Sequence, residues 1–197
     1  ASPLRGMGRQ LPLPASLVRR GMTVLIVLML SKSIYNVSFS SYYTFFLITR
    51  FGLTTGQSQI CLFIYLACVA AGTIIGGPIG DRIGRRKVIL WSIFGILPLT
   101  LILPWLPLIP TILVSGLAGM ILASAFPAMI VYGQDLMPQH TGTVGGLLFG
   151  LAFGIAAIGA AALGGLADLW DIVTVYRIVA FLPALGIVAF LLPDTRH

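Results

Sequence analysis

Six long apolar segments follow one another along the 197-residue chain, and short polar connections separate them. The segments cover residues 22–49, 59–79, 88–106, 111–132, 144–167 and 172–192. Each is close to the roughly 20 apolar residues that cross a bilayer as a helix. Nothing in the chain alternates in the ten-residue pattern of a membrane barrel strand. The pattern therefore predicts an all-α membrane protein with a bundle of six transmembrane helices in residues 22–193.

The composition supports a membrane location and argues against a nucleic-acid-binding protein. Hydrophobic residues make up 58% of the chain and charged residues only 9%, against roughly 25% charged residues in soluble domains. So little charge cannot cover a surface in water, which leaves the lipid bilayer as the main partner. The net charge of +7 comes from bases that lie between the apolar segments and not along one soluble face, so we expect no nucleic-acid partner.

The distribution of Lys and Arg predicts the orientation. With the N-terminus in the cytoplasm, nine bases lie inside: Arg5, Arg9, Arg19, Arg20, Arg82, Arg85, Arg86, Lys87 and Arg196. Arg50 and Arg177 fall at the outer ends of their segments, where Arg177 would anchor the interface. Because cytoplasmic loops collect Lys and Arg, we expect a multi-pass protein of the cell membrane with both termini in the cytoplasm. Residues 1–21 and 194–197 would be cytoplasmic tails, the first a linker to an absent segment.

Glycines repeat every four residues in two of the segments. Gly72, Gly76 and Gly80 do so in the second, and Gly142, Gly146, Gly150 and Gly154 do so in the fifth. Small residues at this spacing form a groove in which another helix backbone can pack closely. We therefore expect both helices to pack tightly against neighbours. Pro98, Pro104 and Pro127 are expected to bend the third and fourth helices.

Polar residues inside the first segment are the candidate substrate contacts. Lys32 lies about 18 Å along the helix from Arg20, near the middle of the hydrocarbon core. Lys32, Tyr35, Asn36 and Tyr43 share one helical face with Phe39. A membrane-buried lysine is costly unless it meets water, an anion or a carboxylate. One interpretation is a cation that lines an aqueous cavity, and the alternative is a lysine that reaches the interface or pairs with an acid. Tyr65 is a weaker candidate contact, with packing favoured.

Ionisable groups for catalysis or metal binding are not brought together anywhere in the chain. All five Asp residues lie at or beyond segment ends, and there is no Glu. If protons drive transport, the carboxylate that carries them must come from another part of the protein. Cys61 and Cys68 lie too far apart along one helix to bond to each other, and we interpret them as core residues. We therefore expect no metal and no cofactor, and an enzyme is the least favoured class.

One short connection has a distinctive pattern, "GGPIGDRIGRRKV" between the second and third segments. Gly76, Gly77 and Gly80 are expected to allow a tight exit from the helix, and Gly84 a reversal. The pattern G-x-x-x-D-R-x-G-R-R-K resembles the signature loop of the major facilitator superfamily. Its residues here are Gly77, Gly80, Asp81, Arg82, Gly84, Arg85, Arg86 and Lys87.

The similarity extends over roughly residues 31–193. Stretches such as "SAFPAMIVYGQDLMP" and "GLLFGLAFGIAAIGAAALGGLAD" resemble the C-terminal half of fosmidomycin resistance proteins. The resemblance implies one six-helix half of a twelve-helix fold, and proton-driven efflux of fosmidomycin-like or other small anionic compounds. It also implies a partner, the N-terminal six-helix half, which this chain lacks. The alternatives are a permease for another drug, sugar or metabolite, and a non-transporting fragment that needs a partner half.

The resemblance also implies roles for the charged residues of the loop. Asp81 would cap the positive end of a helix in the opposite half, an interaction of roughly 0.3–2 kcal/mol. Arg85 or Arg86 would pair with Asp135 at the cytoplasmic end of the fourth helix, in one conformational state and not in the other. Because fosmidomycin is a phosphonate, an intramembrane cation suits it, and the candidate contacts remain Lys32, Tyr35, Asn36 and Tyr43.

Overall fold

The computed structural model describes residues 14–170 and 172–181, and the described chain is built from helices. They are α1 (Ala15–Phe51), α2 (Thr55–Ile83), α3 (Arg85–Ile102), α4 (Leu108–Leu136), α5 (Thr141–Leu169) and α6 (Ile172–Val179), with short 3₁₀ turns η1 (Leu103–Trp105) and η2 (Pro138–His140). This confirms the all-α prediction. Five of the helices, α1 to α5, are long and apolar enough to cross a membrane. The sixth predicted segment begins with α6, and its residues 182–192 lie outside the described part.

Four of the helices, α1, α2, α4 and α5, are longer than the apolar segments that predicted them. The longest, α1, begins at Ala15 rather than at residue 22, and its 37 residues span about 55 Å. That length exceeds a hydrocarbon core of about 30 Å. An apolar segment marks the part of a helix in lipid, whereas backbone hydrogen bonding continues into the polar region beyond it.

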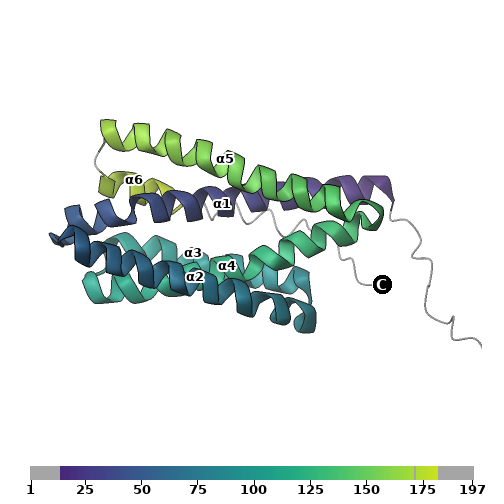
Figure 1. The fold of residues 1–197 in the computed structure, drawn as a ribbon, viewed down its shortest axis with the longest axis horizontal. Coiled ribbons are helices and arrows are strands. Elements are labelled where there is room, and N and C mark those ends of the chain that lie inside the picture. The colour runs from purple at the N-terminus through teal and green to yellow at the C-terminus, as the bar shows by residue number, and fades with distance from the viewer. Residues whose placement is uncertain (1–13, 171, 182–197) are drawn as a thin grey trace, which may run out of the picture.

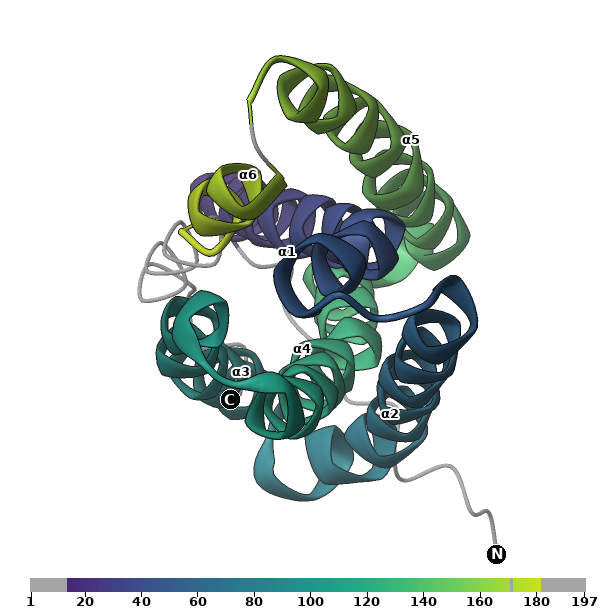
Figure 2. The same cartoon turned by 90° about the vertical axis from the view of Figure 1, so that its left-hand side faces the viewer.

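The helix α1 lies in the middle of the bundle (Figures 1 and 2). On one side are α5 and α6, and on the other are α2, α3 and α4. Two clusters of buried side chains fill the interior, and α1 contributes to both. The first contains Leu25, Leu28, Met29, Ile89 and Met129. The second is richer in aromatic rings and contains Tyr35, Phe39, Tyr43, Tyr65 and Ile96.

Glycine sets the distance between α2 and α4. A Cβ carbon at Gly72 would lie 2.2 Å from the carbonyl oxygen of Met120, and one at Gly76 would lie 2.1 Å from that of Ser124. No side chain fits at either position, so the predicted close packing of the second segment is confirmed there.

The fifth segment differs from the prediction. No described atom lies within 4 Å of a Cβ placed at any of its four repeating glycines, Gly142, Gly146, Gly150 and Gly154. The expected tight packing along this stripe is therefore not made within the described chain. Instead, α5 packs on α1 through later residues, such as Gly159 against Ile34.

Two glycines with positive φ end helices. Gly52 (φ 66°) ends α1, and a capping box between Thr54 and Gln57 then begins α2. Gly84 (φ 100°) ends α2 and precedes α3, as the expected reversal requires. The expected early exit at Gly76, Gly77 and Gly80 is wrong, because these residues are helical and α2 continues to Ile83.

The prolines are distributed between helix interiors and a helix end. Pro98 and Pro127 lie inside α3 and α4, as expected, and Pro78 lies inside α2. Pro104 lies outside α3, in the 3₁₀ turn η1, because the α-helix has already ended at Ile102.

Candidate functional site

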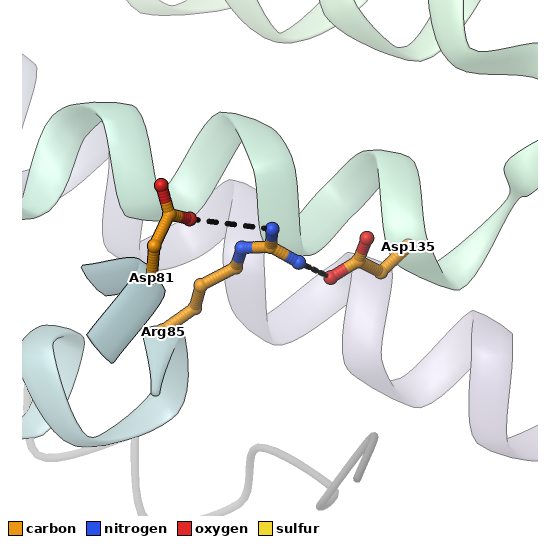
Figure 3. Close-up of polar contacts among 3 residues, drawn as sticks. All are labelled: Asp81, Arg85 and Asp135. Atoms are coloured by element: carbon orange, nitrogen blue, oxygen red, sulfur yellow. Dashed lines mark hydrogen bonds and ion pairs between the residues drawn. The ribbon is translucent and has the colours of Figure 1, made fainter. Parts of the chain in front are cut away.

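Three charged side chains meet where α2 joins α3 (Figure 3). The guanidinium of Arg85 donates a hydrogen bond to Oδ2 of Asp135, and its other terminal nitrogen lies 3.5 Å from Oδ1 of Asp81. Arg85 is the first residue of α3, while Asp81 and Asp135 lie in the last turns of α2 and α4. One base therefore links the ends of three helices. Of the two bases expected to pair with Asp135, the structure contains the pair with Arg85.

These ion pairs are partly exposed to solvent. The side chain of Arg85 is 32% exposed, that of Asp135 39% and that of Asp81 70%. Pairs of this kind contribute about 0–1 kcal/mol each to stability. Little free energy is therefore needed to break them, which suits a contact that is made in one state and lost in another. That role stays a prediction. The other bases of the loop are the exposed Arg82 and Lys87 and the half-buried Arg86.

Lys32 lies inside the bundle and does not line an open surface. It is only 5% exposed, and its Nζ donates a hydrogen bond to Oγ of Ser92 in α3. The Ser92 hydroxyl in turn donates to the carbonyl oxygen of Ile89 at 2.7 Å. Among the described residues, no carboxylate forms an ion pair with Lys32. Lys32 thus matches neither expected arrangement, and its contact with a substrate stays a prediction.

Two other predicted contacts are also buried. Tyr35 is 3% exposed and Tyr43 is fully buried, with its hydroxyl 2.8 Å from Oγ of Ser115 in α4. Their rings flank Phe39 at centroid distances of 5.6 Å and 4.9 Å. Tyr65 of α2 joins the same stack, 4.9 Å from Phe39. These aromatic rings hold α1, α2 and α4 together.

Asn36 is the predicted contact that remains partly open. Its side chain is half-buried, and its Oδ1 accepts a 2.7 Å hydrogen bond from the hydroxyl of Tyr65. The four predicted residues therefore do not act as one surface. Helical spacing put them on the same side of α1, but the neighbouring helices cover three of them.

The open side of α1 carries hydroxyl groups that the sequence analysis did not select. Ser33, Ser40 and Thr44 are half-buried and Ser41 is exposed. Ser33, Ser40 and Thr44 follow the repeat of an α-helix, with Val37 between them on the same face and Ser41 beside them, so these hydroxyls form a stripe that Val37 interrupts. The stripe could have been found from this spacing. It was missed because a lysine in a membrane segment is the stronger signal for function.

Contacts on either side place this hydroxyl stripe between α2 and α5. Toward α2, Asn36 bonds to Tyr65. Toward α5, the hydroxyl of Tyr42 donates to the carbonyl oxygen of Ala160 at 2.9 Å. The open sides of α2 and α3 are different, with Phe63 72% exposed and Trp91 66% exposed. Large apolar side chains suit lipid, whereas a row of hydroxyls beside an amide suits water or a polar ligand.

A sequence model of the Major Facilitator Superfamily matches residues 14–197. The chain belongs to this family of membrane transporters. A solved structure of another major facilitator transporter, FucP in the outward conformation, has the same fold with a TM-score of 0.70 and 17% sequence identity. That match covers 89% of this chain and 43% of FucP. The family makes the chain a multi-pass membrane protein and explains the signature loop around Asp81 and Arg85.

Two curated proteins are similar in sequence. The fosmidomycin resistance protein of Escherichia coli (strain K12) is 51% identical over 186 residues, which cover 94% of this chain and 46% of that protein. The uncharacterized MFS-type transporter YfnC of Bacillus subtilis (strain 168) is 42% identical over 156 residues, covering 79% of this chain and 38% of YfnC. The chain thus spans about half the length, or less, of the curated relatives it matches.

Proposed function

We propose that this chain is the C-terminal half of a transporter that uses the proton gradient to export fosmidomycin-like or other small anionic compounds, and so confers antibiotic resistance. The observation that carries the proposal is the 51% identity to the E. coli fosmidomycin resistance protein, which extends over almost the whole chain. Transport, not catalysis, is the activity we assign. The protein would lie in the cell membrane with both termini in the cytoplasm.

The partner we propose is a second six-helix bundle. Two observations support it. The chain covers 46% of one relative and 38% of the other. In addition, α5 presents a bare stripe at Gly142, Gly146, Gly150 and Gly154 that no described residue covers. Bare helix backbone of this kind is typical of a surface against which another helix packs. Any carboxylate that carries the proton would then belong to that partner, since every Asp of this chain lies at or beyond a segment end.

We assign the substrate surface of this half to the open side of α1. Asn36 and the hydroxyl stripe of Ser33, Ser40, Ser41 and Thr44 offer hydrogen-bonding groups along that side. Lys32, Tyr35 and Tyr43 lie behind this surface, and a direct contact from any of them requires the helices to move. In the same scheme Arg85 with Asp81 and Asp135 is the conformational switch, together with the glycines and bases of the loop.

A second substrate class is favoured by the chemistry of the stripe. The open side of α1 combines hydroxyls with one amide, while the nearest cation, Lys32, is turned inward. Neutral donors and acceptors also suit a sugar or another polar metabolite. The relative YfnC has no stated substrate, so the family likeness leaves room for this alternative.

The test is fosmidomycin tolerance of cells that express the full-length protein. We expect growth at drug concentrations that stop control cells, and we expect a protonophore to remove the difference. Uptake of labelled fosmidomycin into inverted membrane vesicles with an imposed pH gradient measures the same activity directly. Uptake of a sugar or another metabolite, with none of fosmidomycin, would favour the second class. No transport of either by correctly inserted protein would contradict the proposal.

A further inference from the structure

We propose that Tyr65 is a positioning residue for substrate recognition. Its hydroxyl holds the side-chain amide of Asn36 so that the amide nitrogen faces the open side of α1, where it donates a hydrogen bond to an anionic oxygen of the substrate. The inference rests on the proposed function, because it takes the open side of α1 to be the substrate surface. It assigns a role to a buried tyrosine on α2 that makes no contact with the substrate.

The position of the Tyr65 hydroxyl is fixed by its surroundings. The residue is 1% exposed, and its ring lies 4.9 Å from that of Phe39 and 5.9 Å from that of Tyr43. On its other side is α4, where a Cβ carbon at Gly119 would lie 2.7 Å from the ring atom Cε2 of Tyr65. A larger residue at 119 would displace the ring. Packing against α1 and α4 therefore leaves the hydroxyl one location, beside Asn36.

The hydrogen bond sets which way the amide points. A tyrosine hydroxyl donates one hydrogen, and the group of Asn36 that accepts a hydrogen is Oδ1. The 2.7 Å bond therefore directs the oxygen toward α2 and the nitrogen away from it. Within the described chain Nδ2 donates no hydrogen bond, and it is not among the buried polar atoms that lack a partner. The amide nitrogen is thus open at the surface of the bundle.

An open amide near the middle of a membrane helix indicates what lies in front of it. Lipid tails offer no acceptor, and an unpaired N–H group in hydrocarbon is costly. Beside Asn36 the same face carries the hydroxyls of Ser33 and Ser40. A phosphonate or carboxylate oxygen would accept one of these N–H groups in a charge-assisted hydrogen bond, and no buried cation is required. This fits an anionic substrate even with Lys32 turned inward.

A first experiment follows the amide itself. Asn36 is the sole asparagine among the 197 residues, so asparagine-selective ¹⁵N labelling gives one side-chain amide signal from this chain, and its loss in Asn36→Ala assigns it. We expect Tyr65→Phe to shift and broaden that signal, because the amide is then free to rotate. Tyr42→Phe is the matched control. It removes another tyrosine hydroxyl that bonds between helices, the one to Ala160, without touching Asn36.

A second experiment measures fosmidomycin binding to the purified full-length protein by calorimetry. We expect Tyr65→Phe to raise the Kd about three- to tenfold and Asn36→Ala to raise it at least as much. The double variant should match Asn36→Ala alone, because Tyr65 acts only through Asn36. Asn36→Asp keeps an acceptor for Tyr65 but replaces the donors with a negative charge, so it should abolish binding. Tyr42→Phe should change the Kd less than twofold.

The outcomes separate the inference from the proposed function. If Tyr65→Phe leaves the amide signal and the Kd like those of Tyr42→Phe, the positioning role is wrong while fosmidomycin binding stands. Additive effects of Tyr65→Phe and Asn36→Ala would also overturn it, because they indicate a general packing role. The wild-type protein could bind no fosmidomycin while its amide signal still responds to Tyr65→Phe. That result would contradict the proposed substrate class and the anionic ligand, but Tyr65 would still orient the amide of Asn36.

Discussion

Gly76 of α2 lies directly against the main chain of Ser124 in α4, where a Cβ carbon would be 2.1 Å from the Ser124 carbonyl oxygen. We therefore expect Gly76→Ala to lower the stability of the folded protein by about 1–3 kcal/mol, because two helix backbones must separate. Gly77→Ala is the control, since nothing lies within 4 Å of a Cβ there. In a helix interior it should stabilise by a few tenths to about 1 kcal/mol. Thermal unfolding in detergent measures both, and equal effects would contradict the close contact.

Ser92 supplies the hydrogen-bond acceptor for the buried ammonium of Lys32. We expect Ser92→Ala to destabilise the protein by about 1–3 kcal/mol, because Lys32 would lose the one hydrogen-bond partner that it has among the described residues. Lys32→Met removes the charge at similar volume and should be near neutral or stabilising. In a protein that already carries Lys32→Met, Ser92→Ala should change the free energy of unfolding little. Denaturation of the wild type, the two single variants and the double variant measures the coupling between Lys32 and Ser92. Loss of fosmidomycin tolerance in correctly folded Lys32→Met would instead indicate that Lys32 contacts the substrate.

Arg85 links Asp81 and Asp135 at the ends of three helices. We expect Arg85→Gln to reduce transport at least tenfold while it lowers stability by no more than about 1 kcal/mol, because the pairs are partly exposed. Lys87→Gln removes the same charge from the same loop at an exposed position and should have a smaller effect. Vesicle uptake measures the effect on transport, and thermal unfolding measures the effect on stability. A loss of stability that accounts for the loss of transport would argue against a switch.

Gly150 belongs to the α5 stripe that no described residue covers. We expect Gly150→Leu to leave the packing of this bundle unchanged but to weaken its association with the complementary half. Gly159→Leu is the comparison, because its Cβ would lie 2.9 Å from Cγ2 of Ile34 and would disturb α5 within the bundle. Co-purification of the two halves, expressed as separate chains, measures the association. Undiminished co-purification of Gly150→Leu would place the interface elsewhere.

Lys87 and Gln57 are exposed residues at opposite ends of the helices, beside the loop and at the start of α2. With Cys61 and Cys68 replaced by alanine, we expect a cysteine at position 87 to react with a membrane-impermeant maleimide only from the cytoplasmic side. A cysteine at position 57 should react only from outside. This follows from the excess of Lys and Arg on the loop side of the chain. The reverse pattern would invert the proposed orientation.

The candidate site was only partly predictable from the residues. The resemblance to the signature loop limited the expected partners of Asp135 to Arg85 or Arg86, and the structure contains the pair with Arg85. The orientation of α1 was not predictable in the same way. Helical spacing places Lys32, Tyr35, Asn36 and Tyr43 on one face, but it does not reveal which neighbours cover that face. The structure buries all but Asn36 under α2, α3 and α4.

The amino-acid sequence by itself determined the helical class, the location in a membrane and the family, because lipid requires every backbone hydrogen bond to be satisfied and the loop pattern is distinctive. Tertiary structure decided which glycines touch another helix, which polar face of α1 stays open, and that Tyr65 reaches Asn36. These outcomes depend on how helices rotate and pack against one another. Such packing depends on residues far apart in the chain, and no local pattern records it.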